Sequence, residues 1–193
     1  MHPVAPQLVL ASSSPRRFDL LTEAGLCFVV VPAEVEEWHD EAVPVGELTR
    51  VNAALKAEWV AQRHPGSWVI GADTLVSIDG WVLGKPADLA EARGMLGRLA
   101  GRTHEVGTAV CLIHGETGRR REFVERTQVT FRALGDEEIE RYLSLINPLD
   151  KAGSYAAQEH GEVIIEEVVG AYSNVVGLPM ERLMEELRDL GAV

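Results

Sequence analysis

Hydrophobic and polar positions divide the chain into short apolar runs and segments with helical spacing. Residues 8–11 form an apolar run that predicts a buried strand. Ser14 and Pro15 follow it and are typical of a helix cap and a first helical position, and Gly25 is placed to end that helix. The apolar run at residues 27–31 predicts a second buried strand.

The middle of the chain continues this alternation. Apolar residues spaced by three and four positions predict a helix over about residues 46–63. Residues 68–72 predict a buried strand, and the pair Asp79-Gly80 is a strong hairpin turn signal after it. Asp88 is placed to cap the helix that comes next.

The last part of the chain adds two long strands, one shorter strand and two helices. Residues 104–114 and 122–131 predict antiparallel strands joined by a turn. Asp136 is placed to cap a short helix, residues 163–169 predict a strand, and Pro179 opens a final amphipathic helix.

This order of elements predicts the fold class. Helices alternate with strands, but two hairpins interrupt the series, which favours an α/β fold with a long twisted mixed sheet and flanking helices over a plain doubly wound sheet. The chain has no internal repeat and no long linker, so a single domain over residues 1–193 is expected. Ligand sites in such folds lie where strands end and helices begin.

Composition and charge restrict the partners and the compartment. The 18 Lys and Arg residues against 30 Asp and Glu residues give a net charge of −12, which argues against a protein that coats nucleic acid. No apolar stretch reaches the roughly 20 residues that a membrane-spanning helix needs. Cys27 and Cys111 lie in apolar runs and are predicted to be buried thiols in a reducing compartment, so the expected location is the cytoplasm.

A serine- and arginine-rich segment follows the first predicted strand. Arginine is usually unfavourable at a helix N-terminus, because it meets the positive end of the helix dipole. Two arginines there are explained if an anion lies between them, in a phosphate cradle formed by Ser12, Ser14, Arg16 and Arg17. The alternative is a capped helix with two solvated arginines.

Three further positions carry charge in unusual places. Asp73, followed by Thr74, interrupts an apolar strand, which fits a metal ligand or general base, or else a turn aspartate that bonds its own backbone. Lys85 lies between glycine and proline after a strand, where it suits a phosphate or a protected sheet edge. Lys56 lies beside the apolar face of the long helix, where a snorkelling stem is the simpler interpretation.

Two loop-like segments complete the candidates. Residues 150–158 end in Gln158, whose amide offers the donor and acceptor that reading a base edge requires, although a solvated glutamine is the alternative. Residues 171–179 are interpreted as ordinary entry into the last helix. The chain has no Walker A loop and no GxGxxG motif, which argues against P-loop and Rossmann nucleotide binding.

Taken together, the segments LASSSPRR, VIGADTLV, LGKP, DKAGSYAAQ and YSNVVGLP, in this order, resemble the Maf family of nucleoside triphosphate pyrophosphatases. The resemblance implies the architecture of inosine triphosphate pyrophosphatases, with two lobes around a cleft. It implies cleavage of nucleoside triphosphates between the α and β phosphates with a divalent cation, Mg²⁺ or Mn²⁺. It also implies a cytoplasmic protein that is often a homodimer, and neither nucleic acid nor membrane is an expected partner.

The resemblance also assigns residues by position. Asp73 matches the proton acceptor, and Glu37 matches an acidic residue that assists the metal or the water, so both are expected at the metal. The triphosphate-binding positions are matched by Ser12, Arg16, Arg17, Lys56 and Lys85. Base selectivity is associated with Arg16, Thr74 and Gln158.

The residue pattern further resembles one subgroup. Thr74 after Asp73, together with Gln158, is similar to the subgroup that acts on dTTP and UTP, whereas the 7-methyl-GTP subgroup has glutamine after the aspartate and lacks Gln158. Glu159 and Ala171 depart from the pattern, since glycine and serine are common there. The competing hypotheses are a pyrophosphatase of the 7-methyl-GTP type and a non-catalytic, nucleotide-binding regulator of cell division.

Overall fold

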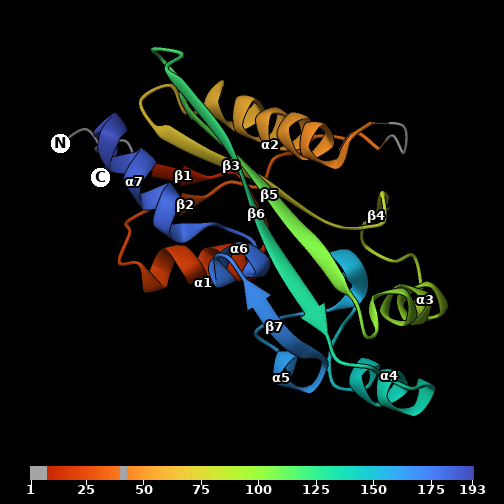
Figure 1. Cartoon of the computed structure of the whole chain (residues 1–193). Coiled ribbons are helices and arrows are strands. Elements are labelled where there is room, and N and C mark those ends of the chain that lie inside the picture. Colours follow the sequence, from red (N-terminus) through yellow and green to blue (C-terminus); the bar gives the residue numbers. More distant parts are fainter. Residues whose placement is uncertain (1–7, 40–42) are drawn as a thin grey trace. The chain divides into compact units, whose positions relative to one another are not determined.

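The chain folds into a mixed α/β structure, as the element order predicts. A computed structural model describes residues 8–39 and 43–193. Its seven-stranded sheet has the order β2-β1-β3-β5-β6-β7, with β4 paired to β3 (Figure 1). β1 pairs in parallel with β2 and β3, whereas the pairs β3–β4 and β6–β7 are antiparallel. The sheet is therefore mixed, and the expected fold class is confirmed.

The strands are β1 (Leu8–Leu10), β2 (Val29–Val30), β3 (Trp68–Ile78), β4 (Trp81–Leu83), β5 (Thr103–His114), β6 (Arg120–Phe131) and β7 (Ile165–Val169). The helices are α1 (Pro15–Glu23), α2 (Val45–Ala61), α3 (Leu89–Leu99), α4 (Asp136–Leu143), the short 3₁₀ turn η1 (Ala152–Ser154), α5 (Gly161–Ile164), α6 (Tyr172–Val176) and α7 (Met180–Leu190).

The chain divides into two compact units that alternate along the sequence. The described residues of the first unit lie within 8–73, 108–125 and 177–193, and those of the second within 74–107 and 126–176. The boundary falls between Asp73 and Thr74, inside β3. The single domain over residues 1–193 stays a prediction beside this division.

The core of the first unit lies between α2 and the strands. Ala53, Ala57 and Val60 on α2 pack with Val9 of β1 and Val69 of β3. Figure 1 shows α2 on one side of these strands and α1 and α7 on the other, which explains why every residue of β1 is buried.

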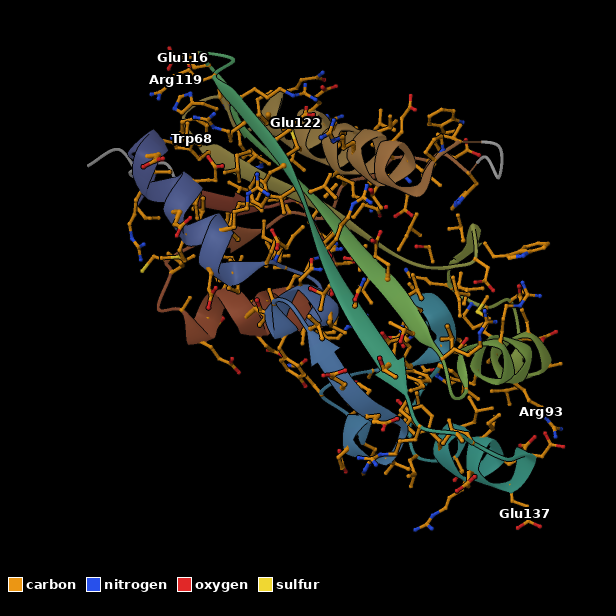
Figure 2. All side chains as sticks on the ribbon, in the orientation of Figure 1. Trp68, Arg93, Glu116, Arg119, Glu122 and Glu137 are labelled. Carbon is orange, nitrogen blue, oxygen red and sulfur yellow. The ribbon has the colours of Figure 1, made fainter. Side chains whose placement is uncertain are left out.

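The side chains of His114 and Arg119 pack against Trp68, the first residue of β3. The ring of His114 meets the Trp68 ring edge-on at 5.3 Å between centroids. The guanidinium carbon of Arg119 lies 5.6 Å from the Trp68 ring centre, and both residues are labelled in Figure 2. Trp68 is 5% exposed, so this packing anchors the start of β3. The part of β3 that belongs to the first unit runs from Trp68 to Asp73.

The second unit has its own core between α3, α4 and the adjoining strands. Leu96 and Leu99 of α3 pack with Tyr142 of α4 and Phe131 of β6. On the surface, Arg93 of α3 pairs with Glu140 of α4 at 3.0 Å. Figure 2 marks the two helices by Arg93 and by Glu137.

Several predicted elements differ from the structure. β2 is two residues long and exposed, and Cys27 before it is exposed, so the prediction of a buried strand and thiol is wrong there. A strand with one neighbour has no partner on its outer side, which leaves Val29 and Val30 exposed. Cys111, in the middle of β5, is buried as predicted.

Smaller differences concern helix ends. Gly135, not Asp136, is the N-cap of α4, and its N–H donates a hydrogen bond to the Glu138 carboxylate at 2.6 Å. The predicted strand at 163–169 begins at Ile165, because Gly161–Ile164 forms the helical turn α5. Within residues 8–39 and 43–193, each helix is too short or too polar to cross a membrane.

Candidate active site

The close approach of α2 to β3 brings two charged side chains together. A Cβ on Gly71 would lie 2.3 Å from the Ala53 carbonyl oxygen and 2.7 Å from the Ala57 Cβ, so only glycine allows this separation. Lys56 precedes Ala57 on the helix, and Asp73 follows two residues after Gly71 on the strand. The glycine therefore sets the distance between a lysine and an aspartate.

Lys56 joins two carboxylates. Its ammonium nitrogen lies 2.8 Å from Asp73 Oδ1 and 2.8 Å from Glu37 Oε1. The side chains of Lys56 and Asp73 are 12% and 9% exposed, whereas that of Glu37 is 38% exposed. The other carboxylate oxygen, Asp73 Oδ2, is buried and accepts no hydrogen bond from the described part of the chain. A buried carboxylate oxygen in this state is available to a metal ion or to water.

Arg17 is the second cation of the cluster. Ser14 caps α1 by accepting from the Arg17 N–H, so the arginine lies in the first turn as predicted. The Nε atom of the guanidinium donates to the Gly177 carbonyl oxygen at 3.0 Å, and its Nη1 atom donates to Ser12 Oγ at 3.1 Å. Arg17 is 9% exposed, which excludes the alternative of a solvated side chain at this position.

The charges around Arg17 act on one another. Burial lowers the pKa of Arg17 from its ordinary value, and the charge of Asp73 opposes that shift. Arg16 lowers the pKa further, and Glu37 raises it. Arg17 therefore lies within the electrostatic reach of both carboxylates. Arg16, Arg17 and Lys56 against Asp73 and Glu37 give this part of the chain an excess of one positive charge, in a chain of net charge −12.

The structure thus brings together one group of the predicted site residues: Ser12, Arg16, Arg17, Glu37, Lys56 and Asp73, all in the first unit. The remaining three, Thr74, Lys85 and Gln158, belong to the second unit. Thr74 is half-buried on β3, Lys85 is exposed after β4, and Gln158 is exposed between η1 and α5. That these three act with the first group stays a prediction.

Sequence reasoning missed two residues. Gly177 was expected in an ordinary helix entry, yet its carbonyl holds Arg17. Its φ of +137° is a conformation that side chains rarely adopt, so a glycine just before a Leu-Pro helix start was the signal. Lys151 was not singled out within its loop-like segment, but it is 4% exposed, and its ammonium donates to the Asn147 carbonyl oxygen and to Asp150. An aspartate directly before it was the available sign of an ion pair.

The donor set fits a divalent cation. Carboxylate oxygens are the protein ligands that Mg²⁺ and Mn²⁺ prefer, and Mg²⁺ is commonly held by one or two carboxylates together with substrate phosphates. Asp73 Oδ2 is buried and has no hydrogen-bond partner among the described residues, and Glu37 is ion-paired to Lys56, which also binds Asp73. Among the described residues, no group of three or more His, Cys, Asp or Glu forms a complete metal cage. The two carboxylates therefore suit a metal that a phosphate helps to bind.

The mixed α/β fold and the cluster of Lys56, Arg17 and two carboxylates define an α/β protein with a partly buried group of charged side chains. The chain belongs to the Maf family: the model described as "Maf-like protein" matches residues 7–190.

Relatives extend this finding over nearly the whole chain. A dTTP/UTP pyrophosphatase of Akkermansia muciniphila is 50% identical over 96% of this chain and 97% of its own length. A protein of the same name from Symbiobacterium thermophilum is 48% identical over 96% of this chain and 94% of its own length. A nucleoside-triphosphatase/dITP/XTP pyrophosphatase structure from Mycobacterium abscessus aligns at 17% identity with a TM-score of 0.45, over 81% of this chain and 93% of that one, too distant to carry an argument.

Proposed function

We propose that this protein hydrolyses nucleoside triphosphates between the α and β phosphates, releasing the monophosphate and pyrophosphate, with dTTP and UTP as preferred substrates. The names of relatives that are 50% and 48% identical support this proposal. The observation that carries it is the position of the Lys56 ammonium, 2.8 Å from both Asp73 and Glu37. A polyphosphate-binding cation and two metal-binding carboxylates thereby meet at one point.

The cations of the first unit bind the polyphosphate. A triphosphate carries about four negative charges, and cleavage moves further charge onto the leaving pyrophosphate. Arg17 and Lys56 are held in place before substrate arrives, by Ser12, Gly177, Asp73 and Glu37. Preorganised cations stabilise developing charge without reorganising during the reaction. Lys85 adds a further positive charge in this proposal.

Asp73 accepts the proton of the attacking water. Its Oδ2 atom is buried and accepts no bond from the described residues, so a water molecule can donate to it. Lys56 holds Oδ1 and thus fixes the orientation of the carboxylate. A Mg²⁺ or Mn²⁺ bound by Asp73 and Glu37 would lower the pKa of water and offset phosphate charge.

The pyrimidine preference rests on the second unit. Thr74 and Gln158 are the residues through which this chain resembles the dTTP and UTP subgroup. The primary amide of Gln158 can both donate to and accept from the Watson–Crick edge of uracil or thymine. We further propose that the protein acts in the cytoplasm, on free nucleotides, as a homodimer.

A pyrophosphate-release screen tests the proposal directly. The full chain is assayed with dTTP, UTP, CTP, dATP, dGTP and 7-methyl-GTP, each with Mg²⁺, Mn²⁺ or EDTA. We expect release from dTTP and UTP that requires the metal. Preference for 7-methyl-GTP would contradict the subgroup, and tight binding of dTTP without any release would favour the non-catalytic regulator instead.

A further inference from the structure

Lys151 links the two ends of the loop that carries Gln158, because its ammonium contacts both Asp150 and Glu159. Its side chain is 5% exposed, and its ammonium nitrogen is surrounded by three oxygens. The Asn147 carbonyl oxygen lies at 2.8 Å, Asp150 Oδ1 at 2.9 Å and Glu159 Oε1 at 3.4 Å. Two of the three N–H donors of this ammonium are hydrogen-bonded to Asn147 and Asp150, and the Glu159 carboxylate forms an ion pair with it. Lys151 is therefore a structural tie and not a phosphate ligand.

The first part of this loop is fixed by buried contacts. The N–H of Gly153 donates to the Gly84 carbonyl at 3.0 Å, and the Tyr155 hydroxyl lies 2.8 Å from His104 Nε2. The N–H of Ala156 donates to the Tyr142 hydroxyl at 3.1 Å. The backbone is thus anchored up to Ala156, two residues before Gln158.

Beyond Ala156 the surroundings change. Gln158, Glu159 and His160 are exposed, and α5 begins at Gly161. In this stretch, the ion pair from Glu159 to Lys151 ties the exposed chain back to the anchored part. Gln158 lies between Ala156, whose N–H is hydrogen-bonded, and Glu159, which is ion-paired to Lys151. The chain is therefore restrained on both sides of Gln158.

We infer that Glu159 and Lys151 are positioning residues for Gln158, and that their ion pair sets the discrimination between pyrimidine bases. This rests on the proposed function, in which Gln158 reads the base. A glycine at position 159 would have no side chain to reach Lys151. The ion pair therefore gives this chain a restraint on Gln158 that a glycine there would not supply.

The test compares binding of two nucleotides that differ at the base edge. Non-hydrolysable α,β-methylene analogues of UTP and CTP are titrated by calorimetry into the full-length wild type and into Glu159→Ala, with Mg²⁺ present. We expect Glu159→Ala to reduce the preference for the uracil analogue about fivefold to tenfold, as a loosened hydrogen-bonding group does. Glu159→Gln, which keeps the length of the side chain but removes its charge, is expected to lose the preference to a similar extent.

A double-mutant cycle separates positioning from a general structural effect. In a Gln158→Ala background, Glu159→Ala is expected to change the preference no further, because the group that it positions is gone. Additive losses would overturn the inference. Glu162→Ala is the matched control: it removes an exposed carboxylate, 76% accessible, three residues further along and not on Lys151.

Hydrogen exchange gives a readout that needs no substrate. We expect the amides of residues 157–160 to exchange faster in Glu159→Ala than in the wild type or Glu162→Ala. Unchanged exchange, or faster exchange with an unaltered base preference, would overturn the inference. A wild type that releases no pyrophosphate would instead refute the proposed function, and the exchange and binding measurements would still decide the role of Glu159.

Discussion

The Lys56 ammonium nitrogen lies 2.8 Å from Asp73 Oδ1, across 17 positions of sequence. Both side chains are nearly buried, so each charge depends on the other and on Glu37 for compensation. Because Oδ1 is occupied by the lysine, Oδ2 is the oxygen left for the proton transfer that we propose for Asp73. One oxygen of Asp73 binds Lys56 and the other has no partner among the described residues, which makes Asp73 the most informative residue to change.

Asp73→Asn keeps the shape of the side chain but removes the proton acceptor. We expect kcat for dTTP to fall at least about 100-fold, the range typical for loss of a general base. The fold should persist, because Lys56 retains Glu37; circular dichroism and a thermal melt check this. Asp79→Asn, on the exposed turn between β3 and β4, is the control and should keep its activity. Normal turnover by Asp73→Asn would remove it from the mechanism.

Glu37 should control metal affinity more than turnover. Glu37→Gln removes a carboxylate from the proposed cation site, and we expect the Mg²⁺ concentration for half-maximal activity to rise about tenfold. Saturating Mg²⁺ should restore most of kcat. The neighbouring Glu36→Gln, which changes an exposed side chain, should leave the metal titration unchanged. Identical titrations for the two variants would place the metal elsewhere.

Gly177→Ala should weaken substrate binding through Arg17. The added Cβ has room, with its nearest contacts at 3.6 Å and 3.7 Å, but the φ of +137° is strained for alanine. Such strain is on the order of 1–3 kcal/mol, and relieving it moves the carbonyl away from Arg17. We expect KM for dTTP to rise several-fold with a smaller change in kcat. Gly25→Ala has φ of +73° in the same unit without touching Arg17, and should alter stability but not KM.

His104 should make the second unit less stable in acid. Burial lowers the pKa of His104 to about 4, and its Nδ1 atom has no hydrogen-bond partner among the described residues. Above pH of about 6.5 the imidazole is neutral in both the folded and unfolded states. As pH falls from 6.5 towards 4, only the unfolded chain takes up the proton, so stability is lost, by about 3 kcal/mol in full.

Urea unfolding at pH 7 and pH 4.5 measures this effect. His104→Gln, which can still hydrogen-bond Tyr155, should lose much less stability between the two pH values than the wild type. The same change at His39, which is exposed in the first unit, should leave the wild-type dependence intact. Equal acid sensitivity in all three proteins would show that other groups account for the pH dependence.

Local features of the sequence predicted the elements well. Ser14 and Pro15 fix the start of α1, and Asp79-Gly80 fixes the β3–β4 hairpin, because caps and tight turns depend on a few adjacent residues. The exposure of Cys27 could not be predicted in this way. An apolar run is the same whether its strand is central or at an edge, and β2 lies at the edge of the sheet.

The contacts that build the candidate site depend on distant residues. The sequence supplied Asp73 and Lys56 as separate candidates, but their pairing follows from the packing of Gly71 against α2, which no local pattern contains. The glycine before Leu-Pro signals an unusual backbone at Gly177, but nothing in the sequence indicates that its carbonyl accepts from Arg17. The sequence was therefore enough to select candidate site residues, whereas the contacts between them could be identified only from the folded structure.

The bond from Arg17 to Gly177 joins residues 160 positions apart. A ribosome adds about 5–20 residues per second, so Gly177 is synthesised roughly 8–32 s after Arg17. During that interval the nascent chain has its serines, lysine and aspartate but lacks the carbonyl that holds the guanidinium. A product that ends before residue 177 lacks this acceptor, so Arg17 cannot take up its observed hydrogen bond until the chain has been synthesised through Gly177.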